Sequence, residues 1–160
     1  MIEEVQYFGY GANRDPAMMA AIIGREPEGS PAKLSGFELG IMKWPEIPEK
    51  ARNMLKGSWD ESFRSYGVRP TGNQAKAVVG HVWKITRAER RLIDNWELTG
   101  EWYKVFTLQY ELAPNKEEQI EIQVIEEPIR QIVSGRRYKT FLNDKKKMMK
   151  VAAACREQYR

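Results

Sequence analysis

The chain has 160 residues, 42% of them hydrophobic and 30% charged, and carries a net charge of +4. This length and composition predict one globular domain over residues 1–160 and exclude a disordered chain. Its apolar runs fall short of the roughly 20 residues that span a bilayer, and the acidic start "MIEEVQYFGY" is unlike a secretory signal, so no membrane partner is expected. The single cysteine, Cys155, excludes an internal disulfide and favours a cytoplasmic protein.

The N-terminal quarter predicts a strand, a helix and a second strand. "VQYFGYG" (5–11) combines aromatic and β-branched residues with glycines, which favours a strand. Asp15 is suited to N-cap a helix over 16–24 that has proline at its first position and Gly24 at its end. "KLSGFELGIMKW" (33–44) has strand character interrupted by glycines, so a bulge or a barrel bend is expected there.

The middle of the chain begins with its least regular segment. Residues 45–73 carry many turn signals around a short helix in "KARNMLKGSWDESF", which indicates a long functional loop or a lid. "AKAVVGHVWKIT" (75–86) predicts an apolar strand. A helix over 86–98 follows, because Thr86 and Glu89 have the spacing of a capping box.

Two more strands and a helical C-terminal third complete the pattern. Alternation predicts strands over 101–113 and 116–127, the second with one solvated face, joined by a turn at Pro114-Asn115. "RRYKTFLND" and "KKKMMKVAAACREQY" indicate helix. The order of elements predicts an α+β fold, a small mixed β-barrel with flanking helices, although the pattern does not by itself separate a barrel from an open sheet.

Positive charge is concentrated near the C-terminus. Residues 129–160 carry a net charge of +8, whereas the rest of the chain carries −4. One interpretation is a nucleic-acid or acidic-partner binder that uses this segment. The other is a solvated helical face, which is favoured because the few aromatic residues in this segment argue against a base-stacking platform.

The residue inventory limits the possible chemistry to carboxylates. One histidine, His81, lies in an apolar strand and one cysteine lies far from it, so no His/Cys metal cluster is expected and His81 is interpreted as structural. Glu97 follows "LIDNW" at the end of the predicted helix, where the macrodipole opposes a negative charge. Burial against Trp96 or Trp102 would raise its pKa further and suit it to acid–base work near neutral pH. The alternative is a surface glutamate at a helix end.

The loop "GYGAN" between the first strand and the first helix is the second candidate. It lacks the spacing of a phosphate-binding loop and the third glycine of a dinucleotide fingerprint. A small-residue turn before a helix still exposes N–H donors that suit a carboxylate or a developing oxyanion. A purely structural turn is the alternative.

Three segments together resemble the γ-glutamylcyclotransferase-like family. "YFGYGAN" is similar to the strand and "YGSN" loop that open those proteins. "VVGHVWKITRAERRLIDNWELTGEWYKVFTL" is similar to their second signature, a strand, a helix reading "L-D-x-x-E-G" and a tyrosine on the next strand. "SGRRYKTFL" resembles a late segment in which a tyrosine starts the terminal helix.

This resemblance implies a fold and a reaction. The fold is a small barrel with flanking helices, and the reaction converts a γ-glutamyl amide or γ-glutamyl-amine to 5-oxoproline with release of the amine or amino acid. It needs no metal or cofactor, and its partner is the small-molecule γ-glutamyl substrate. The resemblance places the general acid/base at Glu97 and the substrate-binding residues at Tyr10, Gly11, Ala12, Asn13, Tyr103 and Tyr138.

The sequence departs from that pattern at three places. Ala12 stands where the family has serine, Leu98 stands where it has glycine, and residues 45–73 are longer than the family pattern. Two other classes therefore stay open beside the enzyme. One is a non-catalytic small-molecule binding protein on the same fold, and the other is the basic nucleic-acid or acidic-partner binder described above.

Overall fold

The strand β1 (Glu4–Gly9) lies at the centre of the larger sheet because both of its faces carry apolar side chains. Val5 and Tyr7 pack toward the helices, whereas Phe8 packs into the concave interior of the sheet. The structure, a computed structural model, describes residues 2–159. The other strands and the helices are arranged around this doubly covered strand.

The larger sheet has five strands in the order β2-β5-β1-β7-β6. β1 runs parallel to β7 and antiparallel to β5, so the predicted mixed sheet is confirmed. The β6–β7 hairpin turns at Pro114-Asn115, as predicted, with Asn115 in the left-handed region at φ 62°. The other strands are β2 (Glu28–Ser35), β5 (Ala77–Thr86), β6 (Lys104–Ala113) and β7 (Lys116–Val124).

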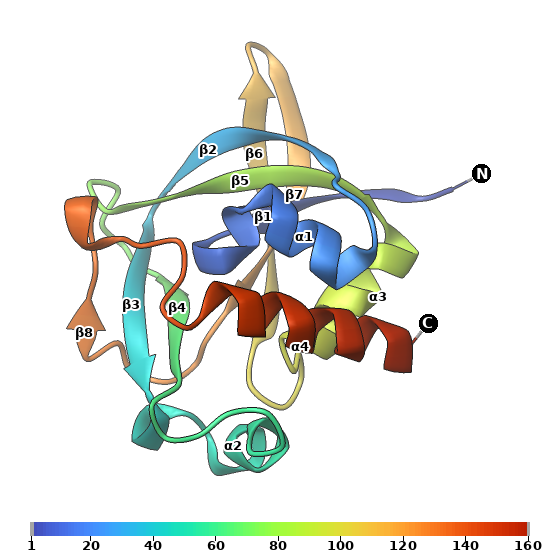
Figure 1. Cartoon of the computed structure of the whole chain (residues 1–160). Helices are drawn as coiled ribbons and strands as arrows, with labels where there is room; N and C mark the ends of the chain where they lie inside the picture. The colour runs from blue at the N-terminus through green and yellow to red at the C-terminus, as the bar shows by residue number, and fades with distance from the viewer. Residues whose placement is uncertain (1, 160) are drawn as a thin grey trace.

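A second sheet continues the first. β2 passes into β3 (Phe37–Lys43) through Gly36, whose φ of 84° favours glycine, and this is the bend expected within 33–44. β3 pairs with β4 (Arg64–Pro70) and β8 (Gln131–Ile132). The two sheets curl toward one another into a half-barrel (Figure 1). The predicted α+β class is therefore confirmed, with the barrel half closed.

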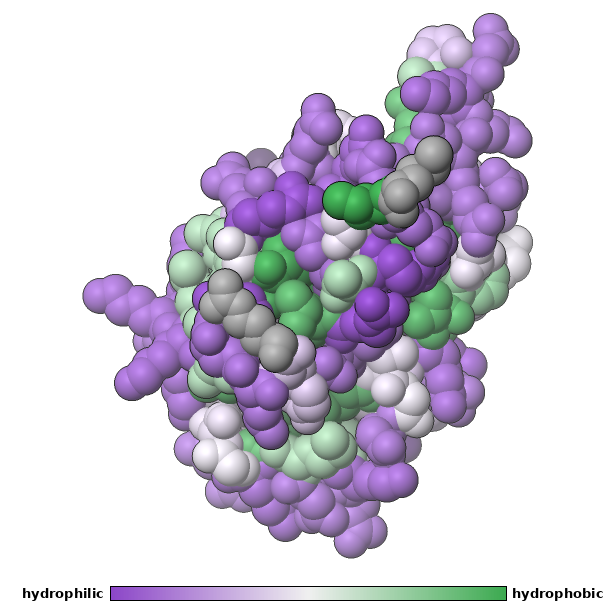
Figure 2. All heavy atoms as spheres, turned by 90° about the vertical axis from the view of Figure 1, so that its right-hand side faces the viewer, coloured by the Kyte–Doolittle hydropathy of each residue, from purple (hydrophilic) through white to green (hydrophobic). Residues whose placement is uncertain are grey.

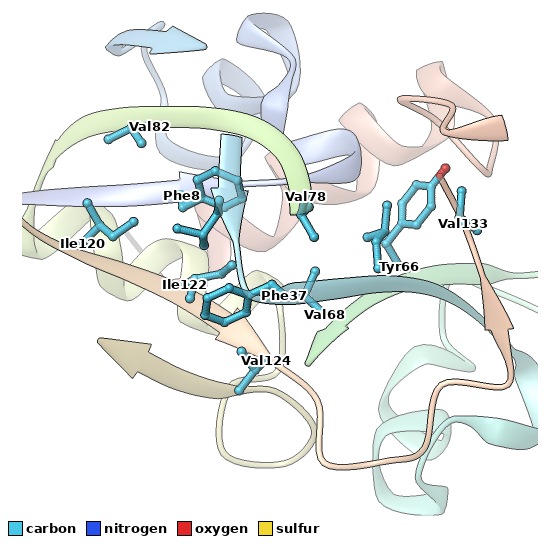
Figure 3. Close-up of a cluster of buried hydrophobic side chains, with 12 residues drawn as sticks. Phe8, Phe37, Tyr66, Val68, Val78, Val82, Ile120, Ile122, Val124 and Val133 are labelled. Atoms are coloured by element: carbon cyan, nitrogen blue, oxygen red, sulfur yellow. The ribbon is translucent and has the colours of Figure 1, made fainter. Parts of the chain in front are cut away.

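The concave side of the half-barrel is filled by one apolar cluster. Phe8 of β1 meets valines of β4 and β5 and isoleucines of β7 there (Figure 3). The rings of Phe37 and Phe106, from the two sheets, lie edge to face with centroids 5.7 Å apart. Ile125 N–H donates to the carbonyl oxygen of Val68 at 3.0 Å and ties the end of β7 to β4.

Three helices cover the outer face of β1 and β5. They are α1 (Pro16–Ile23), α3 (Arg87–Trp96) and α4 (Lys145–Gln158), and they enclose a second apolar cluster with Tyr7 and Trp83. The predicted start signals are confirmed, since Asp15 accepts from Met18 N–H at 2.9 Å and Thr86 forms a capping box with Glu89.

Two sequence expectations were incomplete or wrong. The short helix inside 45–73 is present as α2 (Glu49–Leu55), after a 3₁₀ turn η2 (Trp44–Glu46), but the end of that segment forms β4. The helix expected over 136–144 is absent from the described chain, which has only the 3₁₀ turn η3 (Gly135–Arg137) there. The reason is tertiary, because Asn143 exchanges two hydrogen bonds with the main chain of Arg64.

The molecular surface is mostly hydrophilic where α3 and the end of α4 lie (Figure 2). Among residues 2–159, no helix is both long and apolar enough to cross a membrane. The cations of the basic C-terminal segment are partly engaged inside the molecule. Arg156 Nη1 donates to the carbonyl oxygens of Ala20 and Ala21 at 2.9 Å and so caps α1, and Lys145 lies 3.8 Å from Asp15.

The glycine that ends β1 is required by packing. A Cβ at Gly9 would collide with the main-chain oxygen of Asn13, which folds back over the strand. Gly9→Ala is expected to destabilise the protein by about 2 kcal/mol, because backbone and not a flexible side chain must move. Denaturant unfolding measures the effect. Gly57→Ala is the control, since nothing lies within 4 Å of its added Cβ, and an equal loss in both variants would contradict the packing argument.

Candidate active site

Glu97 lies directly after the last residue of α3 and forms its C-cap. The helix ends there because Leu98 adopts a left-handed backbone conformation, with φ 53°. Its carbonyl oxygen then accepts from Trp102 N–H at 2.9 Å and closes a tight turn. A leucine in this conformation costs about 1 kcal/mol, which glycine would avoid. The turn aims the Glu97 carboxyl back toward the loop that follows β1.

The loop after β1 meets Glu97 through one side chain. Asn13 Nδ2 donates to Glu97 Oε1 at 2.6 Å. The main chain of Asn13 is fixed as well, since its carbonyl oxygen accepts from Trp83 Nε1 at 2.7 Å and its N–H donates to Tyr10 O at 3.2 Å. Asn13 is only 5% exposed, so this amide is a fixed partner of the carboxyl.

A ring of hydrogen bonds fixes the orientation of that amide. Asn13 Nδ2 also donates to Tyr7 Oη at 2.9 Å, and Tyr7 Oη donates to Gln123 Oε1 at 3.1 Å. Gln123 Nε2 donates to Thr99 Oγ1 at 2.7 Å, and Thr99 lies two residues after Glu97. The ring therefore begins and ends on the same turn. Each polar group constrains the next, which holds the carboxyl in one geometry.

Burial decides the charge state of Glu97. Removal from water raises the pKa of its carboxyl to about 7, and the nearby Asp94 adds to the rise. The hydrogen bond from Asn13 and the charge of Arg90 act in the opposite direction and leave the pKa near neutrality. Arg90 is itself buried and lies between Asp94 at 2.7 Å and Glu121 at 3.0 Å. Asp94 thus pairs with an arginine one helical turn earlier.

An open pocket brings most of the predicted residues together. It spans about 740 Å³ with its mouth included. The predicted site residues that line it are Tyr10, Gly11, Ala12, Asn13, Glu97 and Tyr103. Residues more than 80 positions apart in the sequence thus line one cavity.

The tyrosines have defined roles in shaping this pocket. Tyr10 Oη donates to Gln123 O at 2.7 Å, and Tyr103 Oη donates to Tyr66 O at 2.5 Å. Burial raises the pKa of Tyr10 and of Tyr103 well above the usual value, so both stay protonated at neutral pH. Tyr138 stands behind the loop, where its hydroxyl accepts from Gly11 N–H at 2.7 Å. It is not among the described residues that line the pocket.

The backbone donors of the loop are partly committed within the protein. Gly11 N–H donates to Tyr138 and Asn13 N–H donates to Tyr10. A Cβ at Gly11 would lie 2.6 Å from the ring of Tyr66, and its φ is 60°. The glycine pair of the loop is therefore explained by close packing, and the group that faces the carboxyl is the side chain of Asn13.

Sequence reasoning missed several residues of the site. Gln123 lies on the face of β7 expected to be solvated, yet it is 2% exposed. Arg90, which the sequence analysis did not single out, is 1% exposed, and its guanidinium lies 5.1 Å from the ring of Tyr7. Trp59 and Phe63 line the pocket from the irregular segment. Only the density of aromatic residues in that segment gave any signal.

The carboxylates near the pocket are paired with nitrogen donors. Within residues 2–159, no group of three or more His, Cys, Asp or Glu side chains is placed to bind a metal ion. Glu97, Asp94 and Glu121 are instead joined to nitrogen donors, namely Asn13 and Arg90.

Among the comparisons with known proteins, only the comparison of structures finds similar proteins. No protein-family model matches the sequence, and no curated protein matches it significantly. A solved structure named γ-glutamyl cyclotransferase aligns over 95% of this chain and 79% of its own, with a TM-score of 0.59 and 17% identity. The chain thus has the γ-glutamyl cyclotransferase-like fold, as its motifs predicted.

Two further structures share this fold. A protein of Homo sapiens described as uncharacterized aligns over 95% of this chain and 79% of its own, with a TM-score of 0.56 and 16% identity. A protein of Arabidopsis thaliana aligns over 98% of this chain and 79% of its own, with a TM-score of 0.51 and 18% identity. At these identities the likeness is one of fold.

The raised pKa of Glu97 makes stability depend on pH. The folded carboxyl keeps its proton up to about pH 7, whereas an ordinary glutamate loses it near 4.5. The contribution of Glu97 to the free energy of unfolding is therefore highest below pH 4.5 and falls, by up to about 3 kcal/mol, as the pH rises to 7. Glu97→Gln is expected to remove this slope. Urea unfolding at pH 5 and pH 8 measures it, and equal slopes in both proteins would refute the assignment.

Proposed function

We propose that this protein is an enzyme that cyclises γ-glutamyl amides or γ-glutamyl-amines to 5-oxoproline, with Glu97 as general acid and base. The observation that carries the proposal is the Glu97 carboxyl, with a pKa near 7, held at 2.6 Å by Asn13 in an open pocket. The shared fold with a structure named γ-glutamyl cyclotransferase supports it.

The reaction takes place within one substrate molecule. The nitrogen of the neutral α-amine attacks the γ-carbonyl carbon, which forms the five-membered ring, and this nitrogen gives up one proton. The bond from that carbon to the leaving nitrogen then breaks, and the leaving nitrogen takes up a proton. Glu97 accepts the first proton and returns the second, so atoms and charge balance without water or a cofactor.

In this mechanism the pocket contributes mainly by positioning the substrate and less by providing reactive groups. Nucleophile and electrophile belong to the same molecule, so holding it folded lowers the barrier through proximity. Tyr10 to Asn13 and Tyr103 line the space beside Glu97 and are the proposed substrate contacts. Tyr138 acts indirectly in this proposal, because it supports the main chain of Gly11. Arg64 is the one cation among the described lining residues, and its Nη1 donates to the carbonyl oxygens of Glu61 and Phe63 at 3.1 Å.

Removal of the acid/base tests the mechanism. Glu97→Gln is expected to lower 5-oxoproline release at least 100-fold, because an amide accepts no proton at neutral pH. The assay is a panel of γ-glutamyl amides with detection of 5-oxoproline. Glu101→Gln is the matched control, since Glu101 pairs with Lys50 at 2.7 Å and does not line the pocket.

Three outcomes would count against this proposal. Wild-type rates in Glu97→Gln would remove Glu97 from the mechanism. Binding of γ-glutamyl amides without any product would favour the non-catalytic binding protein. Binding of nucleic acid that weakens steeply with salt would favour the basic segment 129–160 instead.

The rate is also expected to depend on pH in a defined direction. A general base must be ionised, so kcat/KM rises as the pH increases through about 7, the pKa of Glu97 in the free protein. Initial rates measured between pH 5 and 8 give the profile. A rate that is flat across this range would contradict the role of Glu97 as the group that takes the proton.

A further inference from the structure

The pocket has two chemically different halves. One half is polar and contains Glu97 with the ring of hydrogen bonds around Asn13. The other half, called the apolar wall below, consists of lining residues that share large hydrocarbon side chains: Leu55, Trp59, Phe63, Leu98, Trp102 and Met148. A ligand that fills the whole space must match both halves.

The apolar wall is built mainly by the segment between α2 and β4. Trp59 and Phe63 pack with ring centroids 5.0 Å apart, and Leu55 joins them from the end of α2. Trp59 also contacts the helical cluster, and Lys147 Nζ lies 4.6 Å from its ring. The indole is thus held from two sides. Trp59 and Leu55 are only partly buried, which leaves apolar surface at the pocket.

Leu98 extends this wall to the reacting group. Its backbone stays in the left-handed region although it is not glycine, and its side chain packs on the cluster that contains Phe63 and Trp102. Glycine there would relax the backbone but would remove this part of the wall. The strained leucine therefore points to a function for its side chain. Because Leu98 follows Glu97, the apolar wall begins beside the carboxyl that passes the proton.

The chemistry of the substrate decides which half takes which part. A γ-glutamyl group carries an α-amine and an α-carboxylate, which an apolar surface would desolvate without compensation. The polar half suits that group. The leaving nitrogen must lie close to Glu97, and the substituent on this nitrogen is then left to the apolar wall.

We propose that the amine component of the substrate is a bulky apolar group, with an aromatic ring as the best fit, and that Trp59 and Leu98 select it. This inference rests on the proposed cyclisation and names its substrate class. It also assigns residues 55–63 as the segment that recognises the leaving group.

Two amides that differ only by a phenyl ring test the selection. They are γ-glutamylethylamide and γ-glutamyl-2-phenylethylamide, which share the same bond to be broken. The wild-type protein is expected to favour the phenyl compound at least about tenfold in kcat/KM, because burial of the ring adds binding to the wall. Trp59→Ala is expected to bring this ratio close to one.

Controls separate the wall from general effects on the fold. Met54→Ala removes an exposed side chain of α2 that does not line the pocket, and the ratio should stay at its wild-type value. Leu98→Ala, which retains the Cβ but removes the isopropyl group, should lower the ratio in the same direction as Trp59→Ala. A ratio near one in the wild type, or a ratio unchanged in Trp59→Ala, overturns the inference while cyclisation stands.

Binding to Glu97→Gln keeps the two proposals distinguishable. Isothermal titration of both amides against this variant reads the selection without turnover, and tighter binding of the phenyl compound supports the wall. If neither amide yields 5-oxoproline with the wild type, the proposed function fails, and the titration still decides whether the wall prefers the ring. Equal affinities for the two amides overturn the inference.

Discussion

The hydrogen bond between Asn13 and Glu97 joins the two parts of the chain on which the site depends. One partner lies in the loop after β1 and the other at the end of α3, 84 residues apart, and the two atoms lie 2.6 Å from each other. A carboxyl beside an apolar wall loses hydration, and one amide replaces only part of it. This partial compensation is what places its pKa near 7 and not near 4.5.

The fold makes the contact between Asn13 and Glu97 rigid, because further hydrogen bonds fix the side-chain amide of Asn13. The Tyr7 hydroxyl lies between Asn13 and Gln123, accepts a hydrogen bond from the first and donates one to the second, and its ring packs against the buried Arg90. Because Tyr7 and Gln123 lie on the neighbouring parallel strands β1 and β7, the sheet itself sets the distance between them. The carboxyl is therefore held in one orientation toward the pocket.

Local signals predicted the parts of this arrangement, and tertiary contacts decided the rest. Asp15, Gly24 and the Thr86–Glu89 box are caps, whose chemistry acts within one turn, so the sequence revealed them. The position of Glu97 at a helix end made it a candidate but left a surface glutamate as the alternative, because its burial depends on tertiary contacts. The edge strand β2 was not predicted over its full length, because Pro31 interrupts the strand pattern. Residues 136–144 have a helical pattern, but Asn143 forms hydrogen bonds with the start of β4.

The glycines of "YFGYGAN" show how a short motif can be explained at two levels. Gly9 gives room to the carbonyl oxygen of Asn13, and Gly11 gives room to the ring of Tyr66. These are packing demands, and they would hold in a protein without any ligand. Their consequence is nevertheless chemical, because the loop can reach Glu97 only when its backbone lies this close to β1. Packing and chemistry therefore select the same residues here, and Ala12, which shares the loop without carrying a hydroxyl, leaves the contact through Asn13 intact.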